Sequence, residues 1–107
     1  MNAATRARSQ ASAKILKALA HPARLLVVDE LAKTGELCVC QLTDLVGSDT
    51  STVSRHLAVH KNAGVVEDER RGQKVFFRLR VGCVTKFFEC VEDVIRCNLR
   101  DRARLLD

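Results

Sequence analysis

The sequence predicts a mainly α-helical fold that carries a small β-hairpin, and three patterns support this prediction. Apolar residues recur at helical spacing along most of the chain, which is typical of amphipathic helices. Two of these helices are joined by a three-residue turn that contains Gly47, a helix-turn-helix signature. Residues 65–71 and 74–81 alternate in polarity, which predicts a hairpin, or wing. Together they indicate one winged helix-turn-helix domain over residues 1–107, with the helix-turn-helix at about 38–63 and the wing at 65–81.

Composition limits the kinds of protein that this chain can be. At 107 residues it forms one small domain, and 18 Lys and Arg against 13 Asp and Glu give a formal charge of +5, which favours a polyanionic partner. The sequence has no apolar signal region and no run that reaches the ~18 residues of a membrane span. We therefore expect a cytoplasmic protein without membrane contact. The five Cys then stay reduced, as core residues, ligands or redox groups.

The first two helices precede the helix-turn-helix. We expect a frayed segment over 1–5 and a helix over about 6–20, ended by His21 and Pro22, because Pro suits the first position of a new helix. His21 is expected to support this junction rather than to bind a ligand. The second helix runs from Pro22 to Lys33 before Gly35, a residue typical of helix C-caps. Its expected inward residues are Leu25, Leu26, Val28 and Leu31.

The helix from about Thr50 to before Gly64 has one polar face and one apolar face. Val53, Leu57 and His60 share the inward side, where His60 is interpreted as a core histidine rather than a ligand. Arg55 points outward and suits bidentate contact with guanine. A merely solvated face is the alternative, but the tight turn and the basic wing favour DNA. The candidate DNA-binding residues are Ser51, Thr52, Ser54, Arg55, His56, Asn62, Arg70, Arg71 and Lys74.

The wing and the last helix complete the predicted domain. In the wing we expect the inward residues to be Val75, Phe77, Leu79 and Val81. The last helix, about 83–100, is apolar over roughly half its circumference, whereas a monomer's surface helix needs a stripe of only ~100°. The excess predicts a homodimer that pairs through this helix.

Cys83, Cys90 and Cys97 repeat every seven residues on that helix. Successive members lie ~10.5 Å apart along the axis, too far to chelate one ion within a chain. Packing at the dimer seam is the plainest interpretation. Three functions stay open: a third ligand for an ion held elsewhere, a thiolate site across the two-fold axis, or an inter-chain disulfide.

Cys38 and Cys40 are the candidate metal ligands. Thiolates suit soft ions such as As(III) and Sb(III), although two buried small residues are the alternative interpretation. In a regular helix residues i and i+2 lie about 200° apart, so one ion would have to unwind the helix start. We expect this distortion to act through the three-residue turn on the helix from about Thr50 to before Gly64, which we call the reading helix. Its shift would weaken DNA binding.

Three strings together resemble the ArsR/SmtB family of bacterial metal-sensing repressors: Leu19-Ala20-His21-Pro22-Ala23-Arg24, Glu36-Leu37-Cys38-Val39-Cys40-Gln41-Leu42 and Thr52-Val53-Ser54-Arg55-His56-Leu57. The resemblance implies a winged-helix homodimer that binds a pseudo-palindromic operator as apoprotein and leaves on binding a metal or metalloid. The Cys-Val-Cys string is similar to the sensing sites of the arsenite/antimonite and cadmium/lead branches.

The chain departs from the family pattern at four places. Thr43 replaces a third Cys of the arsenite branch, residues 1–37 lack the N-terminal thiols of the cadmium/lead branch, and the last helix has no His and a single candidate Asp, Asp93, for a zinc site. His60 stands where the family usually has Leu. The third sulfur is therefore open among Cys83, Cys90 and Cys97.

The function that we expect is a transcriptional repressor induced by As(III) or Sb(III), acting on double-stranded operator DNA. The alternatives are a Cd(II)/Pb(II)-responsive repressor and a thiol-redox-responsive repressor. Enzyme activity is not expected, because the sequence has no Cys-x-x-Cys motif and no Gly-rich phosphate loop.

Overall fold

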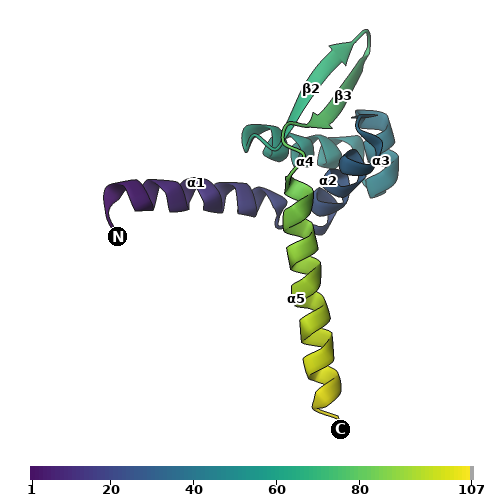
Figure 1. Ribbon diagram of the computed structural model, residues 1–107. Coiled ribbons are helices and arrows are strands. Elements are labelled where there is room, and N and C mark those ends of the chain that lie inside the picture. The colour runs from purple at the N-terminus through teal and green to yellow at the C-terminus, as the bar shows by residue number, and fades with distance from the viewer. Residues whose placement is uncertain (107) are drawn as a thin grey trace.

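The computed structural model describes residues 1–106, which form five helices and a three-stranded antiparallel sheet, with the β2–β3 hairpin projecting above the helices (Figure 1). The elements are α1 (Ala3–Leu19), α2 (Pro22–Thr34), β1 (Leu37–Cys38), α3 (Val39–Val46), α4 (Thr50–Asn62), β2 (Val66–Arg71), β3 (Lys74–Leu79) and α5 (Val84–Arg104). Helices α3 and α4 form the helix-turn-helix and strands β2 and β3 the wing, so the predicted winged helix-turn-helix is confirmed.

The core lies where α2, α3 and α4 meet the base of the wing. The fully buried side chains are those of Val27, Val28, Leu31, Leu42, Val53, Leu57, His60 and Val66. Helix α3 begins directly after β1 and ends at Gly47, whose positive φ of 75° forms the left-handed cap. Asp49 caps α4 by accepting a hydrogen bond from the Thr52 amide at 3.1 Å. The core and these two caps together fix the position of the helix-turn-helix.

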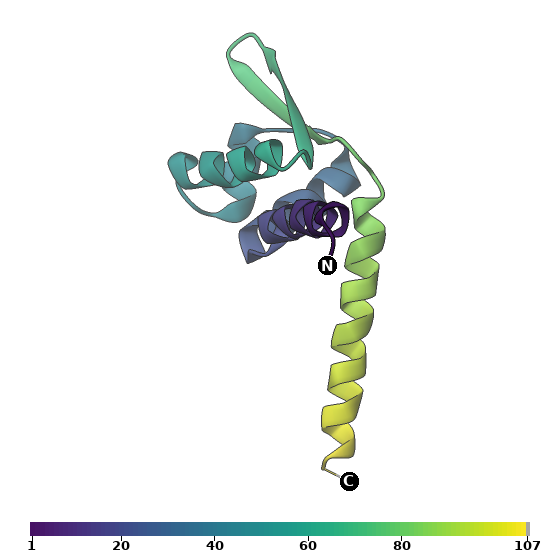
Figure 2. The same cartoon turned by 90° about the vertical axis from the view of Figure 1, so that its left-hand side faces the viewer.

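Helix α1 begins earlier than expected. Asn2 caps it, since its Oδ1 accepts a hydrogen bond from the Thr5 amide at 2.8 Å. The prediction of a frayed segment over 1–5 is therefore wrong, because Asn is a strong N-cap residue that satisfies a free helix donor. Apart from Ala18 and Leu19 the helix is exposed, and it projects sideways from the body (Figures 1 and 2).

Helix α2 is rotated relative to the expectation. Val27, Val28 and Leu31 are buried, whereas Leu25 and Leu26 are each 39% exposed. The inward assignment of Leu25 and Leu26 is wrong because these residues line a groove of about 580 Å³ between α1–α2 and α5. The junction before α2 is as predicted: His21 caps the helix, its Nδ1 accepting from the Ala23 amide at 3.0 Å.

The sheet contains a strand that the sequence did not predict. Strand β1 pairs antiparallel with β3, with Leu37 opposite Phe77 and Cys38 opposite Phe76, so that β3 is the central strand. A two-residue strand is too short to show alternation. At the other end, Val81 is exposed and not inward, because β3 ends at Leu79 and the chain turns towards α5.

Helix α5 packs on the body through Val84 and Phe88 near its start and then runs away from it as a rod (Figures 1 and 2). None of residues 84–104 is buried, and the exposed apolar side chains include Phe87, Val91, Val94, Ile95 and Leu99. The helix starts at Val84 and ends at Arg104, beyond the expected end at about residue 100. Within residues 1–106, none of the helices combines the length and apolar character that crossing a membrane requires.

Candidate metal site and DNA-reading surface

The two candidate ligands lie at the junction of β1 and α3. Cys38 is the last residue of β1 and the N-cap of α3, and its backbone is extended, with φ −81° and ψ 164°. Cys40 lies in the first turn of α3. Because Cys38 is not helical, the two side chains turn to the same side and their sulfurs are 2.6 Å apart. The expectation that the thiols lie on opposite sides of a helix is therefore wrong, and no unwinding is needed.

The two thiols have pKa values shifted in opposite directions. The hydrogen bond from Cys40 to Cys38 lowers the pKa of Cys38, and the nearby amide of Gln41 and charge of Lys74 act in the same direction. The same hydrogen bond raises the pKa of Cys40. Cys38 is 3% exposed, whereas Cys40 is exposed. The pair therefore consists of an inner sulfur that ionises readily and an outer sulfur that solutes can reach.

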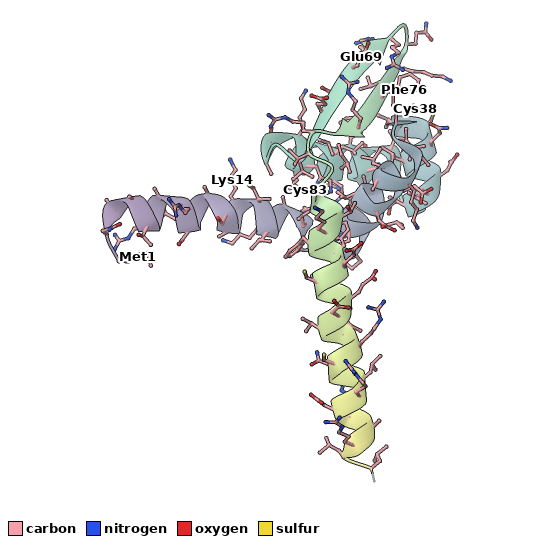
Figure 3. All side chains as sticks on the ribbon, in the orientation of Figure 1. Met1, Lys14, Cys38, Glu69, Phe76 and Cys83 are labelled. Atoms are coloured by element: carbon pink, nitrogen blue, oxygen red, sulfur yellow. The ribbon has the colours of Figure 1, made fainter. Side chains whose placement is uncertain are left out.

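Within the described residues, no third candidate ligand lies beside the Cys38–Cys40 pair. Among residues 1–106, no group of three or more His, Cys, Asp and Glu side chains could hold a metal ion. Thr43 donates its hydroxyl to the Val39 carbonyl at 2.8 Å, so it closes the helix turn. Cys83, the N-cap of α5, and Cys90 and Cys97 on α5 are exposed and do not join the pair. Figure 3 shows Cys38 beside the wing and Cys83 at the start of α5.

The thiol pair is tied to the wing through Glu36. The Glu36 carboxylate accepts hydrogen bonds from both terminal nitrogens of Arg71, at 2.8 Å for Nη2 to Oε2. The Arg71 guanidinium also lies 4.7 Å from the centre of the Phe76 ring, which pairs with Cys38 across the sheet. The hydrogen bonds to Glu36, followed by those to Glu69, raise the pKa of Arg71. The predicted phosphate-binding charge of Arg71 is thus compensated by Glu36, which precedes β1, and by Glu69 of the wing.

Most candidate residues on α4 lie on its outer face. Ser51, Ser54, Arg55 and Asn62 are exposed, and Thr52 is half-buried. Arg55 donates Nη2 to the Thr52 hydroxyl at 3.3 Å, which holds the guanidinium over the first turn of the helix. At the wing tip, Arg70 and Lys74 are exposed, and no ion pair of either residue occurs within residues 1–106.

His56 differs from the other α4 candidates because it is buried. Its Nδ1 accepts a hydrogen bond from Arg24 Nε at 3.1 Å, and its ring centre lies 4.5 Å from that of His21. Burial lowers the pKa of His56. The side chain therefore fastens the start of α2 to α4. Arg24 supplies this link. Arg24 was not among the predicted site residues, and only its position in the family-like string Leu19–Arg24 indicated a role.

His60 is fully buried and only partly satisfied. Its Nε2 donates to the Arg24 carbonyl at 3.0 Å, while its Nδ1 has no hydrogen-bond partner within the described chain. Burial lowers the pKa of His60, so that the neutral ring is favoured. The interpretation as a core histidine is confirmed, and this ring joins α4 to α2 from the inside.

Comparisons with known proteins agree with this architecture. The family model described as "Bacterial regulatory protein, arsR family" matches residues 21–68. The chain is 30% identical over 98 residues to the arsenical resistance operon repressor of Escherichia coli, covering 85% of this chain and 84% of that protein. It is 42% identical over 65 residues to the arsenic resistance transcriptional regulator ArsR1 of Pseudomonas putida, and 37% over 67 residues to a cadmium resistance regulatory protein CadC homolog of Staphylococcus aureus.

These last two matches are partial. They cover 61% and 63% of this chain, and they span only 51% and 55% of the lengths of ArsR1 and the CadC homolog. Among solved structures, a homodimeric winged helix-turn-helix domain from Mycobacterium bovis superposes with a TM-score of 0.79 at 30% identity, over 94% of this chain and 93% of that one. The AntR antimony-specific transcriptional repressor gives a TM-score of 0.75 at 26% identity, over 94% and 90%.

Proposed function

The chain belongs to the ArsR family of bacterial regulatory proteins, and from this premise we propose that it is a transcriptional repressor whose operator binding is relieved by a thiophilic ion, As(III) or Sb(III). The observation that carries the proposal is the pair of sulfurs, Cys38 and Cys40, that meet 2.6 Å apart at the first residue of the helix-turn-helix. The E. coli and P. putida relatives named for arsenic resistance, and the antimony-specific repressor, support the choice of ion.

The chemistry of the pair fits a soft ion. Thiolates prefer soft metal ions. A zinc–sulfur bond is about 2.3 Å long, so one ion can reach both sulfurs once the two sulfurs move slightly apart. Binding requires both thiols to lose their protons. The lowered pKa of Cys38 favours the first loss, and the positive charge of Lys74 favours a thiolate at either sulfur. A further donor comes from outside the described chain, as a partner's thiol or a small-molecule thiol.

Release of DNA follows from where the pair is placed. Cys38 caps α3, and Leu42 of α3 packs in the same core as Val53 and Leu57 of α4. The three residues Gly47-Ser48-Asp49 separate the two helices. An ion that replaces the sulfur–sulfur hydrogen bond therefore acts on the element against which the reading helix is packed. Couplings of this kind are typically 1–3 kcal/mol, or about 5–150-fold in affinity.

The same proposal includes a homodimer. An unpartnered helix with a broad apolar face, α5, and the adjoining 580 Å³ groove leave more apolar surface exposed than a small soluble monomer usually shows. The M. bovis neighbour is described as homodimeric. Two reading helices in a dimer would contact half-sites about 34 Å apart, so a pseudo-palindromic operator is expected.

A gel-shift titration tests the proposed inducer. Reduced protein bound to an operator duplex, selected from a random library by the wild-type protein, is titrated with As(III), Sb(III), Cd(II), Pb(II) and Zn(II). We expect As(III) and Sb(III) to release DNA at the lowest concentrations. Cys38→Ser and Cys40→Ser should keep DNA binding and lose release, while Cys83→Ser, Cys90→Ser and Cys97→Ser, tested one at a time, show whether a partner's thiol is the third donor. Release that survives in both α3 variants would contradict the site.

Thiol oxidation is the second candidate, and the proximity of the two sulfurs favours it. Peroxide would take two electrons and two protons from Cys38 and Cys40, forming one disulfide and two waters, and the thiolate character of Cys38 would speed the attack. Release by peroxide in the absence of metal, reversed by dithiothreitol, would identify this trigger. Release at the lowest concentrations by Cd(II) or Pb(II) would instead identify the cadmium/lead type of sensor.

A further inference from the structure

The positive charge of this protein is concentrated at its N-terminal end. Five of the 18 Lys and Arg residues precede Asp29, the first acidic residue, and the remaining 13 are matched by 13 Asp and Glu. The whole formal charge of +5 is therefore carried by residues 1–28. These five are Arg6, Arg8, Lys14, Lys17 and Arg24. Four of them lie on α1, a helix to which the helix-turn-helix mechanism assigns no contact with DNA.

Three of the four cations on α1 lie on one face of the helix. Arg6, Gln10, Lys14 and Lys17 follow one another at intervals of four, four and three residues, which places them within about 80° of the helix circumference. The distance along the axis from Arg6 to Lys17 is about 16 Å. All four are exposed, and none forms an ion pair within residues 1–106. We call these four residues the basic face of α1.

The basic face continues onto the reading helix. A shallow groove of about 240 Å³ is lined by Lys14, Lys17 and Arg24 on one side and by Val59 and Asn62 of α4 on the other. Asn62 belongs to the outer face of α4, which carries the candidate base-reading residues. Figure 3 shows Lys14 pointing from α1 towards the side of the molecule on which the wing lies.

The opposite side of α1 has a different character. Leu16 and Leu19 line the groove towards α5, and Leu16 is 47% exposed. Leu16 lies about 160° around the helix from Lys14, by the helical period. The apolar side of α1 therefore faces α5, and the basic face points away from it. A partner that covers the α5 groove would leave these cations exposed to solvent.

The wing supplies less free charge than its sequence suggests. Arg71 pairs with Glu36 and Glu69, and Arg78 pairs with Glu67 and Glu69. Such compensated guanidinium groups attract phosphate less than free ones, because the neighbouring carboxylates repel it. The uncompensated charge of the molecule thus lies on α1 more than on the wing.

We propose that the basic face of α1 is a second DNA-contacting surface, which binds backbone phosphates beside the segment that α4 reads. The proposal rests on the proposed DNA-binding function. Double-stranded DNA carries one negative charge per ~1.7 Å of axis, so a 16 Å row of cations can meet phosphates at several points. The contacts position the protein and carry no base specificity. Arg6, Lys14 and Lys17 therefore contribute to affinity for any duplex.

The salt dependence of DNA binding tests this surface. The triple variant Arg6→Gln, Lys14→Gln, Lys17→Gln is compared with wild type by fluorescence anisotropy on two 40-base-pair duplexes, one mixed-sequence and one carrying the selected operator. The matched control neutralises three exposed cations of α5, with Lys86→Gln, Arg102→Gln and Arg104→Gln. Both variants lose the same charge, and circular dichroism verifies that each remains helical. The conservative variant Lys14→Arg, Lys17→Arg keeps the charge.

We expect the basic-face variant alone to change the salt slope. Each phosphate that the protein neutralises contributes about 0.9 to the slope of log K against log salt concentration, so removing three cations from each protomer of a dimer flattens it by about 5. Affinity for both duplexes should fall about tenfold or more at 0.1 M salt, and the Lys-to-Arg variant should match wild type. A slope unchanged from wild type, or equal slope changes in the two triple variants, would overturn the proposal while leaving the DNA-binding function intact. Wild-type protein that binds neither duplex at low salt would instead refute the DNA-binding function itself.

Discussion

Replacing His60 by Leu should stabilise the protein and reduce its sensitivity to acid. The ring is fully buried, its Nε2 donates to the Arg24 carbonyl, and its Nδ1 has no partner within the described residues. An unmade hydrogen bond at a buried polar atom costs about 1–3 kcal/mol, whereas the bond to the carbonyl contributes about 0.5–1.5 kcal/mol. Leu is close to His in volume, so neither a cavity nor overpacking is introduced. We expect His60→Leu to gain about 1 kcal/mol at pH 7.5.

The pH dependence of this effect has a definite sign. Burial lowers the pKa of His60 in the folded protein below its usual value near 6.5. Below pH 6.5 the unfolded state then binds a proton that the folded state does not, so folding loses stability as the pH falls. The loss contributed by one such group is at most about 1.4 kcal/mol per pH unit, and His60→Leu removes this contribution.

Urea unfolding at pH 7.5, 6.5 and 5.5 measures both effects, with protein concentration held constant because a dimer's stability depends on it. Leu57→Met is the matched control, since it conserves volume on the same buried face of α4 and adds no titratable group. It should shift the free energy of unfolding without changing its pH dependence. If His60→Leu unfolds in acid as steeply as wild type, or loses more than about 1 kcal/mol at pH 7.5, the unpartnered nitrogen is not the source of instability.

Two further predictions concern the thiols and the wing. In wild-type protein, ultraviolet absorbance of thiolates should reveal a thiol that titrates below the usual Cys pKa. Both Cys38→Ala and Cys40→Ala should abolish this phase, because the hydrogen bond between the two sulfurs is the main cause. A phase that persists in Cys40→Ala would show that another cause dominates. At the wing, Lys74→Ala should weaken binding to mixed-sequence DNA more than Arg71→Ala does, since Arg71 is already paired with Glu36 and Glu69. Arg71→Ala should change the free energy of unfolding little, because ion pairs at the surface contribute little to stability. An equal or larger loss of affinity in Arg71→Ala would contradict the compensation.

Local sequence signals were sufficient for the helix-turn-helix. Gly47 and Asp49 end one helix and start the next through their own backbone and side-chain preferences, so the boundaries of α3 and α4 follow from neighbouring residues. The predicted start of α1 was wrong although its signal, Asn2, is also local. Periodicity alone ignores a capping side chain, and the cap stabilises the first turn here.

Contacts between distant segments could not be predicted in the same way. The thiol pair depends on Cys38 being held extended by β3, which lies much later in the chain, and a wheel drawn for α3 cannot contain that constraint. The pairing of Arg71 with Glu36 and the burial of His56 against Arg24 are likewise long-range. The chemistry of each side chain could be predicted from its residue type. The partner that changes its role could not, because that partner is brought close only by the tertiary structure.

The position of β1 decides how an ion at the thiols could act on both DNA-contacting elements. Cys38 is both the N-cap of α3, which packs against α4, and a residue of the sheet, where it pairs with Phe76 of the wing. Glu36, two residues earlier, binds Arg71 near the wing tip. A change at Cys38 therefore affects the reading helix through the core. The same change affects the wing through the pairing of β1 with β3. Helix α1 meets α4 around Lys17 and Asn62, on the side of α4 away from the thiols. The proposed phosphate contacts of α1 are therefore expected to add affinity whether or not an ion occupies the thiols. Occupancy is expected to alter the contacts that α4 and the wing make with DNA.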